Sequence, residues 1–277
     1  MDLLLRRSQA LSYDDGTDAL IDRSITHANI QGSTVGSYAF RGCNQLEHVD
    51  MPNTTTIATC GFFGCSNLEN VSAQNLTSIG SYAFYGCSEL DSDNFDFSTL
   101  TTVGTYAFAK CTNITSACLL RATSVGSACF RGSGIKTLVL PVAKYGSTSR
   151  MDNPVDTENG YSVSKLECID LGKTITSFST NALRNNPLKT IILRCTSRNN
   201  LWGGTSVFKG TPFASGGSGG TIYIPKALYD HLGDGTSSDY LAIANWATIN
   251  GYGTITWAKI EGSQYENYYA DGTPIPS

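Results

Sequence analysis

The sequence predicts an α/β repeat solenoid, a coil with one parallel β-sheet, short helical turns on its outer side and a cap at each end. Two observations predict it. A phrase built around a phenylalanine recurs at residues 40, 62, 84, 108 and 130, in steps of 22, 22, 24 and 22. A short apolar phrase of the form L-x-x-V-x-L follows, as in Leu46 to Met51. One such repeat cannot bury its apolar face alone, so neighbouring repeats must supply the core.

Each repeat predicts one strand and one turn. The alternation in L-x-x-V-x-L predicts a short strand whose apolar side chains point inward. Strands of successive coils can pair because neighbouring strands in a sheet lie about 4.8 Å apart. The preceding phrase, such as Gly80 to Phe84, is too short for an isolated helix and predicts a single helical turn with its Ala and Phe buried. Two extra residues between Leu90 and Phe95 account for the step of 24.

These elements divide the chain into three parts. Residues 1–30 form a lead-in and N-terminal cap, and residues 31–225 form about seven or eight coils with an insertion at 142–164. Residues 226–277 form a C-terminal cap and a strand-like tail. Within that tail, the alternation from Thr254 to Lys259 predicts an edge strand. The tyrosine-rich stretch that follows could support self-association.

The repeat resembles that of the BspA-like leucine-rich repeat family, whose units read I-G-x-Y-A-F-x-x-C-x-x-L-x-x-V-x-L-P. The copy from Ile79 to Cys87 reads I-G-S-Y-A-F-Y-G-C. The resemblance is direct from Val35 to Pro141 and degraded from Leu166 to Leu193. It implies a right-handed leucine-rich-repeat coil that binds or adheres, with no catalysis and no cofactor. It also implies a place on a bacterial cell surface or a phage particle.

Charge and hydropathy narrow the choice of partners. The chain has 277 residues and a formal net charge of −4, from 23 acidic and 19 basic residues. Without a basic footprint, we expect no nucleic-acid partner. The N-terminal apolar run, Leu3 to Leu5, ends at Arg6 and is too short for a signal peptide or a membrane span. We therefore expect no export signal and no membrane insertion.

Four cysteines recur with the repeat, at Cys43, Cys65, Cys87 and Cys111. Equivalent residues of adjacent coils, about 5 Å apart, could form disulfides. Alternatively, they are free thiols packed as small apolar residues. We expect the second, because Ser133 replaces the cysteine of the fifth copy. A linear ladder cannot surround a tetrahedral metal, so no metal site is expected.

No catalytic constellation is visible in the sequence. The histidines, His27, His48 and His231, are predicted to lie far apart along the coil. A catalytic site would need such groups to converge. We expect no catalytic residue.

The candidate binding residues are the outward positions of the strand phrases and the aromatic or charged residues of the insertion. The outward positions form columns across the sheet and are either a ligand face or ordinary solvated side chains. On the strands the candidates are His48, Asp50, Asn70, Ser72, Asn94, Asp96, Asp170 and Thr190. In the insertion they are Tyr145, Arg150, Met151 and Tyr161.

Three functions are compatible with this pattern. The first is a non-enzymatic recognition module that binds a protein or a glycan through a face of the coil or through the 142–164 loop. The second is a structural virion component, such as a phage tail-associated protein. The third is a hydrolase, which would need a convergent polar site that the sequence does not show.

Overall fold

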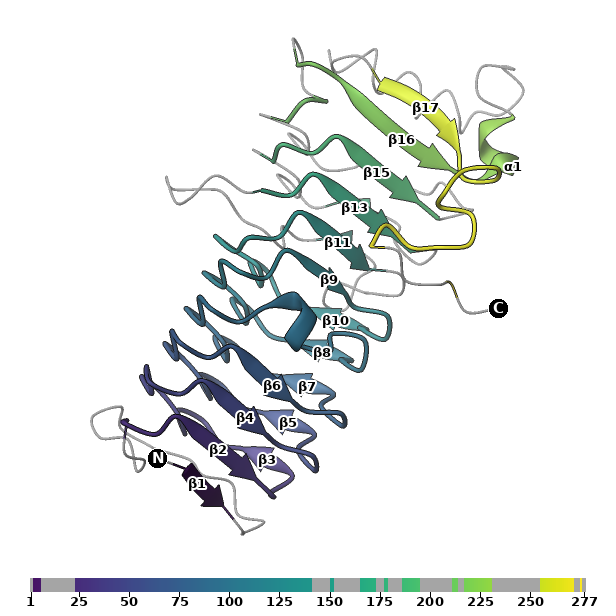
Figure 1. The fold of residues 1–277 in the computed structure, drawn as a ribbon. Coiled ribbons are helices and arrows are strands. Elements are labelled where there is room, and N and C mark those ends of the chain that lie inside the picture. The colour runs from purple at the N-terminus through teal and green to yellow at the C-terminus, as the bar shows by residue number, and fades with distance from the viewer. Residues whose placement is uncertain are drawn as a thin grey trace.

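A computed structural model describes residues 2–5, 23–140, 150–151, 165–172, 177–178, 186–194, 211–213, 217–230, 255–271 and 275. Repeat units stack along one axis, and all paired strands in the described part run parallel (Figure 1). The described residues contain no helix with the length and apolarity that a membrane span requires. The chain thus has a leucine-rich-repeat type of fold with parallel strands and very little helix.

Two sheets lie in a row along one side of the stack. The first has the order β1-β2-β4-β6, and the second has the order β17-β16-β15-β13-β11-β9 (Figure 1). Their strands are β1 Asp2–Leu5, β2 His27–Ile30, β4 His48–Asp50, β6 Asn70–Ser72, β9 Ser116–Cys118, β11 Thr137–Leu140, β13 Cys168–Leu171, β15 Thr190–Leu193, β16 Gly220–Ile224 and β17 Ile255–Lys259. The predicted edge strand is confirmed as β17, which pairs with β16.

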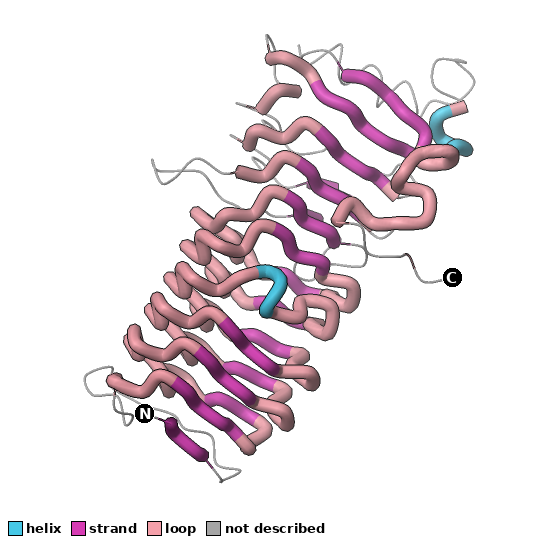
Figure 2. The backbone as a smooth tube through the Cα atoms, in the orientation of Figure 1, coloured by secondary structure: helices cyan, strands magenta, loops and turns pink. Residues whose placement is uncertain are grey.

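The expectation of one continuous sheet is wrong in two respects. A 3-10 helix, η1 Ser92–Asn94, takes the place of a strand and separates the two sheets. A further five-stranded sheet of two-residue strands lies behind the first (Figure 2). Its strands are β3 Thr34–Val35, β5 Thr56–Ile57, β7 Ser78–Ile79, β8 Thr102–Val103 and β10 Ser124–Val125.

The predicted helical turns are also wrong, because the backbone bonds outward to the next coil. Phe40 N–H donates to the carbonyl of Gly61 at 2.8 Å, whereas Arg41 N–H turns back to Tyr38 at 3.0 Å. Tyr38, Tyr82 and Tyr106 adopt φ values of 60, 58 and 57°, in the left-handed region. One left-handed residue interrupts any helical run, so the segment becomes a ladder of turns between coils.

A glycine in the turn phrase is required by the close approach of neighbouring coils. A Cβ atom on Gly104 would lie 2.4 Å from the backbone nitrogen of Ser81. Since no side chain fits at that distance, a glycine at position 104 lets this coil stack tightly on the one before it, whereas the second copy carries Ala58 at the same position.

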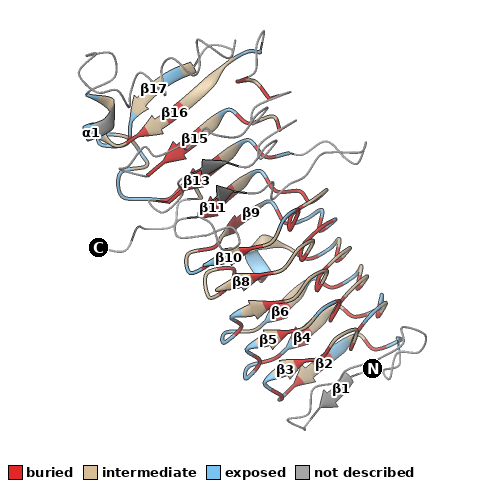
Figure 3. Cartoon of the chain, turned by 180° about the vertical axis from the view of Figure 1, so that it is seen from behind, coloured by how far each residue is buried: buried red, intermediate tan, exposed pale blue. Residues whose placement is uncertain are grey.

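Inside the stack, five phenylalanines form a continuous column of parallel rings. Ring centroids of successive residues are 4.9, 5.3, 5.4 and 5.6 Å apart. The rings belong to Phe40, Phe62, Phe84, Phe108 and Phe130, each at most 1% exposed. Figure 3 colours the chain by burial, and buried residues, in red, recur along the stacked coils. This column belongs to a continuous hydrophobic core, with the buried Val, Leu and Ile residues of the coils, that a single repeat lacks.

The repeating cysteines are free thiols, and three of them, Cys65, Cys87 and Cys111, donate to a carbonyl of the coil before. Cys65 Sγ donates to the carbonyl of Phe40 at 3.1 Å, and Cys87 Sγ donates to that of Phe62 at 3.2 Å. In the fifth copy Ser133 Oγ donates to the carbonyl of Phe130 within its own coil, at 2.7 Å. Burial raises the pKa of Cys65 and Cys87 well above the ordinary thiol value, so both stay protonated.

The remaining described elements are short. β12 Arg150–Met151 pairs with β14 Ser177–Phe178, and α1 Lys226–Tyr229 follows Pro225. Of the loop candidates, Tyr145 and Tyr161 lie outside the described residues, as do the side chains of Arg150 and Met151.

Candidate functional site

The outward face of the first sheet is polar and open. In β4 and β6 the central residue is buried, while Asp50 and Ser72 are exposed. The register places His48 beside Asn70 and Asp50 beside Ser72, so the predicted columns exist on these two strands. Asn70 Nδ2 lies 3.0 Å from His48 Nδ1, a hydrogen bond that links neighbouring coils.

Two histidines that were predicted to lie far apart are neighbours. β2 is already in register with the repeat, and His27 pairs with His48. Their ring centroids are 4.8 Å apart. The lead-in carries no complete turn phrase, which is why the sequence pattern did not place His27 in the first coil.

The predicted strand that was to carry Asn94 and Asp96 is not formed. Asp91 accepts a hydrogen bond from Asp93 N–H at 3.0 Å and caps η1, which accommodates the two extra residues. Asp96 then accepts bonds from Ser98 N and Oγ, at 2.8 and 2.6 Å. Asn94 and Asp96 are both exposed, but on a short helix and a bend.

One serine hydroxyl accepts hydrogen bonds that a backbone carbonyl of the missing strand would otherwise accept. Ser92 Oγ accepts hydrogen bonds from the backbone N–H groups of Thr115 at 2.9 Å and Ser116 at 3.3 Å. In an uninterrupted coil a carbonyl has this role, as where Glu69 and Asn70 N–H donate to Glu47. The chain can therefore break its sheet here and still satisfy these two N–H groups at the start of β9.

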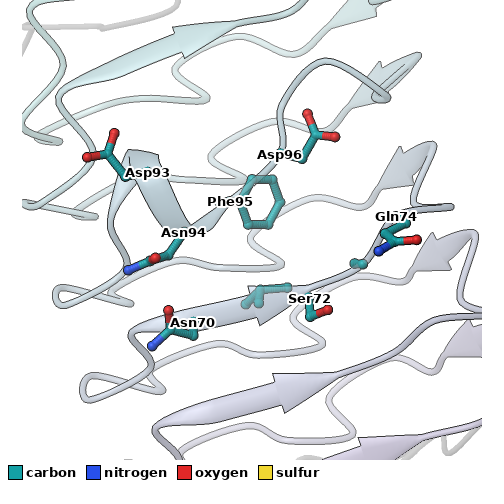
Figure 4. A pocket seen from close by; sticks show the side chains of 9 residues that line it. Asn70, Ser72, Gln74, Asp93, Asn94, Phe95 and Asp96 are labelled. Carbon is teal, nitrogen blue, oxygen red and sulfur yellow. The ribbon is translucent and has the colours of Figure 1, made fainter.

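The break leaves a pocket of about 330 Å³ beside β6 (Figure 4). Its polar residues come from β6 on one side and from η1 and the following bend on the other. They are Asn70, Ser72, Gln74, Asp93, Asn94 and Asp96. Gln74 and Asp93 were not predicted, although the two-residue insertion was the signal for them. The lining offers amides, a hydroxyl and two carboxylates, and it contains no cation.

The outward face of the second sheet is different, and Asp170 is a wrong candidate there. Its side chain is 0% exposed, because Arg194 covers it through two bonds of 2.7 Å, from Nε and Nη2. Val139 and Ile192, in the same column, are likewise 0% exposed. Thr190 is half-buried on β15, beside Cys168 of β13.

The residues after β17 cover this part of the sheet. Arg194 donates to the carbonyls of Tyr265 at 3.0 Å and Tyr268 at 2.9 Å. Ala270 N–H donates to Asp170 Oδ2 at 3.0 Å, and Arg194 lies 5.1 Å from the ring centre of Tyr269. Burial raises the pKa of Asp170, and the hydrogen bonds from Arg194 oppose that rise. The ion pair therefore holds the tail in place, and Asp170 is not exposed to bind another molecule.

Metal chemistry finds no support in the described residues, which contain no group of three or more His, Cys, Asp or Glu placed to hold an ion. The His27 and His48 rings contact each other and Asn70, with Thr26 Oγ1 2.9 Å from His27 Nδ1. The open face is therefore suited to hydrogen bonding.

Sequence comparison agrees with the repeat architecture. Residues 33–149 match the family model described as the BspA type leucine rich repeat region, in six copies. This part of the chain is a BspA-type leucine-rich repeat region. A search of curated proteins finds no match.

Three solved structures illustrate the range of similar chains. The pneumococcal vaccine antigen PcpA is 17% identical with a TM-score of 0.41, over 78% of this chain and 66% of that one. A leucine rich cell surface protein of Faecalibacterium prausnitzii is 17% identical with a TM-score of 0.39, over 91% and 83%. A leucine-rich repeat protein of Bacteroides ovatus is 16% identical with a TM-score of 0.28, over 86% and 85%.

Proposed function

We propose that the chain is a non-enzymatic recognition module, a capped solenoid that binds a protein through the open face of β2, β4 and β6 and the pocket beside η1. One observation carries the proposal. The chain covers the outward side of its second sheet with its own tail, where Val139 and Ile192 are buried, yet leaves the polar side of the first sheet exposed. Extended sheet faces are the usual binding surfaces of repeat proteins.

The chemistry of this open face favours a partner that carries cations and amide groups. Asp50, Asp93 and Asp96 are exposed, and the pocket lining contains no Lys or Arg. Carboxylates that face solvent attract Lys and Arg side chains of a partner and speed the encounter. The face is held by inter-coil hydrogen bonds, so little conformational entropy is lost on binding.

The first experiment is a protein and glycan array probed with the purified chain and with a variant in which a Gly-Ser linker replaces residues 142–164. A protein partner captured by both chains supports the open face. Capture that disappears with the loop would move recognition to the insertion and overturn the proposal.

A pair of charge variants then tests the face directly. For the captured partner, Asp93→Asn with Asp96→Asn should weaken binding at least about 10-fold at low salt, since both amides keep their acceptors but lose charge. The matched control is Glu167→Gln with Glu261→Gln, which removes two exposed charges outside this face. Equal loss in both variants would show that net charge alone drives capture.

A further inference from the structure

A second surface of the molecule, formed by the turn segments, shares no lining residue with the pocket beside η1. The carbonyl of the residue after a core phenylalanine accepts a hydrogen bond from the coil before it, and the same bond recurs from coil to coil. Gly42 N–H donates to the carbonyl of Phe63, Gly64 to Tyr85, Gly86 to Ala109, and Lys110 to Arg131. The side chains in this column are Arg41, Phe63, Tyr85, Ala109 and Arg131.

The fourth copy departs from the repeat at two adjacent positions, of which the first lies in this column. Ala109 stands where the neighbouring coils carry Tyr85 and Arg131, so a large side chain is missing between them. The result is a recess of about 590 Å³, within the range of roughly 300–1,000 Å³ typical of ligand sites. The next residue, Lys110, is exposed at its edge.

Lys110 occupies a backbone conformation that the other copies reserve for glycine. Its φ is 62°, and the equivalent Gly42, Gly64, Gly86 and Gly132 have φ values of 73, 74, 75 and 65°. A side chain in this region costs about 1 kcal/mol or more. The fold does not need the lysine, because its N–H makes the same bond to the next coil that Gly86 makes. Strain without a structural gain points to a function.

Aromatic rings and cations line the recess. Phe63 stacks on Tyr85 and Tyr82 on Tyr106, both with centroids 4.9 Å apart. Lys110 Nζ lies 5.2 Å from the ring centre of Tyr85. Arg131 donates to Tyr106 Oη at 3.1 Å, and its guanidinium carbon lies 5.7 Å from that ring centre. None of the lining residues, all within the described part of the chain, is acidic.

We propose that this recess binds an acidic oligosaccharide, with the carboxylate of a uronic acid unit between Lys110 and Arg131. The aromatic rings offer apolar surface for the C–H groups of a sugar ring, and the tyrosine hydroxyls offer hydrogen bonds to its rim. The two cations in the lining match a carboxylate, and a guanidinium can bind it in two-pronged fashion. A bare anion would contact the two cations but make no use of the aromatic rings.

The decisive variant is Lys110→Gly, which restores the repeat and removes the proposed ligand contact. Calorimetric titration would compare binding of an oligogalacturonate with binding of the neutral galactose oligomer of equal length. We expect the unmodified chain to bind the acidic sugar at least about 10-fold more tightly, and Lys110→Gly to lose that preference. The melting temperature of Lys110→Gly should be equal or higher, because the strained residue is gone.

Two controls separate the site from general charge and general stacking. Lys136→Gln removes an exposed cation beside β11 and should leave binding unchanged. Tyr85→Leu keeps an apolar residue but removes the ring and should weaken binding of the acidic sugar. Poly-glutamate serves as an anion without sugar rings and should bind at least about 10-fold more weakly than the oligogalacturonate.

The proposal fails under several outcomes. Unchanged binding in Lys110→Gly, equal binding of the neutral oligomer, or equal binding of poly-glutamate would each overturn it. So would a fall in melting temperature for Lys110→Gly, which would make the lysine structural. These results do not depend on the protein partner of the open face, because that surface carries none of the substituted residues.

Discussion

The two sheets on the same side of the stack differ in how far their outward side chains are exposed. In β4 and β6 the pattern is half-buried, buried, exposed, and the outermost side chain meets solvent. In β11, β13 and β15 the pattern is half-buried followed by three buried residues. The strands have the same register and pairing, so the difference comes from the outward side chains and from what lies over them.

One repeat can therefore build both an open polar surface and a covered apolar surface. Where the outward residues are Asp50 and Ser72, the face stays open. Where they are Val139 and Ile192, the chain returns with its tail, which is fixed by the pair of Asp170 and Arg194. An uncovered apolar sheet face would invite association with other chains.

Breaking the ion pair should have the largest effect. Asp170→Ala leaves the Arg194 guanidinium buried without its partner and should lower the free energy of unfolding by about 3–5 kcal/mol. Chemical denaturation measures that loss, and hydrogen exchange should show that residues 265–270 lose protection first. The matched control is Glu167→Gln, which removes a 3.7 Å pair with Lys189 whose side chains are 50% and 66% exposed. That variant should cost at most about 1 kcal/mol.

The pH dependence of the same pair follows from the raised pKa of Asp170. A carboxyl whose folded pKa is raised contributes stability below its unfolded value, and that contribution is lost as the pH rises through the folded value. The double variant Asp170→Leu with Arg194→Met lacks this titration and should recover at least about half of the loss caused by Asp170→Ala at pH 7. Lowering the pH from 7 to 4 should therefore raise the free energy of unfolding of the unmodified chain relative to that of the double variant. The opposite trend would show that pairing with Arg194 outweighs burial.

Exchanging the character of outward positions should have a smaller effect and sharpen the comparison. Ile192→Thr buries a hydroxyl under the tail and should cost about 1–3 kcal/mol. Ser72→Val, at an exposed position of β6, should change the unfolding free energy by no more than about 0.5 kcal/mol. Thermal denaturation of both variants measures the difference between their losses of stability. Similar losses would mean that the open face is less exposed than its burial pattern indicates.

The sequence predicts the stacking better than it predicts the surface. Phe40 to Phe130, the inward Val and Leu positions and the columns of β4 and β6 all follow from a period of about 22 residues, because identical positions must meet in adjacent coils. The partner of Asp170 is 24 residues away, and the backbone that covers it is 100 residues away. Periodicity carries no information about contacts of that kind.

Local backbone chemistry explains the other differences. A left-handed Tyr82 is not visible from residue preferences, which favour glycine or asparagine there. Hydrogen bonds between coils hold that conformation, so the segment forms a ladder of turns where a helical turn was expected. Lys110 was detectable in principle, since it replaces the glycine that the other four copies carry at this position.

A small change in stability is also expected at the boundary between the two sheets. Deleting Ser92 and Asp93 restores the sequence Leu-Asp-Asn-Phe-Asp-Phe, which has the spacing of the other strand phrases. We expect a strand over Asn94–Asp96 that joins β6 to β9, with loss of the pocket and a change within about 1 kcal/mol. New ladder bonds would replace both the cap made by Asp91 and the bonds to Ser92 Oγ. A crystal structure of the variant would show one continuous sheet. If Asn94–Asp96 forms no strand in the variant, the two inserted residues are not the cause of the break between the sheets.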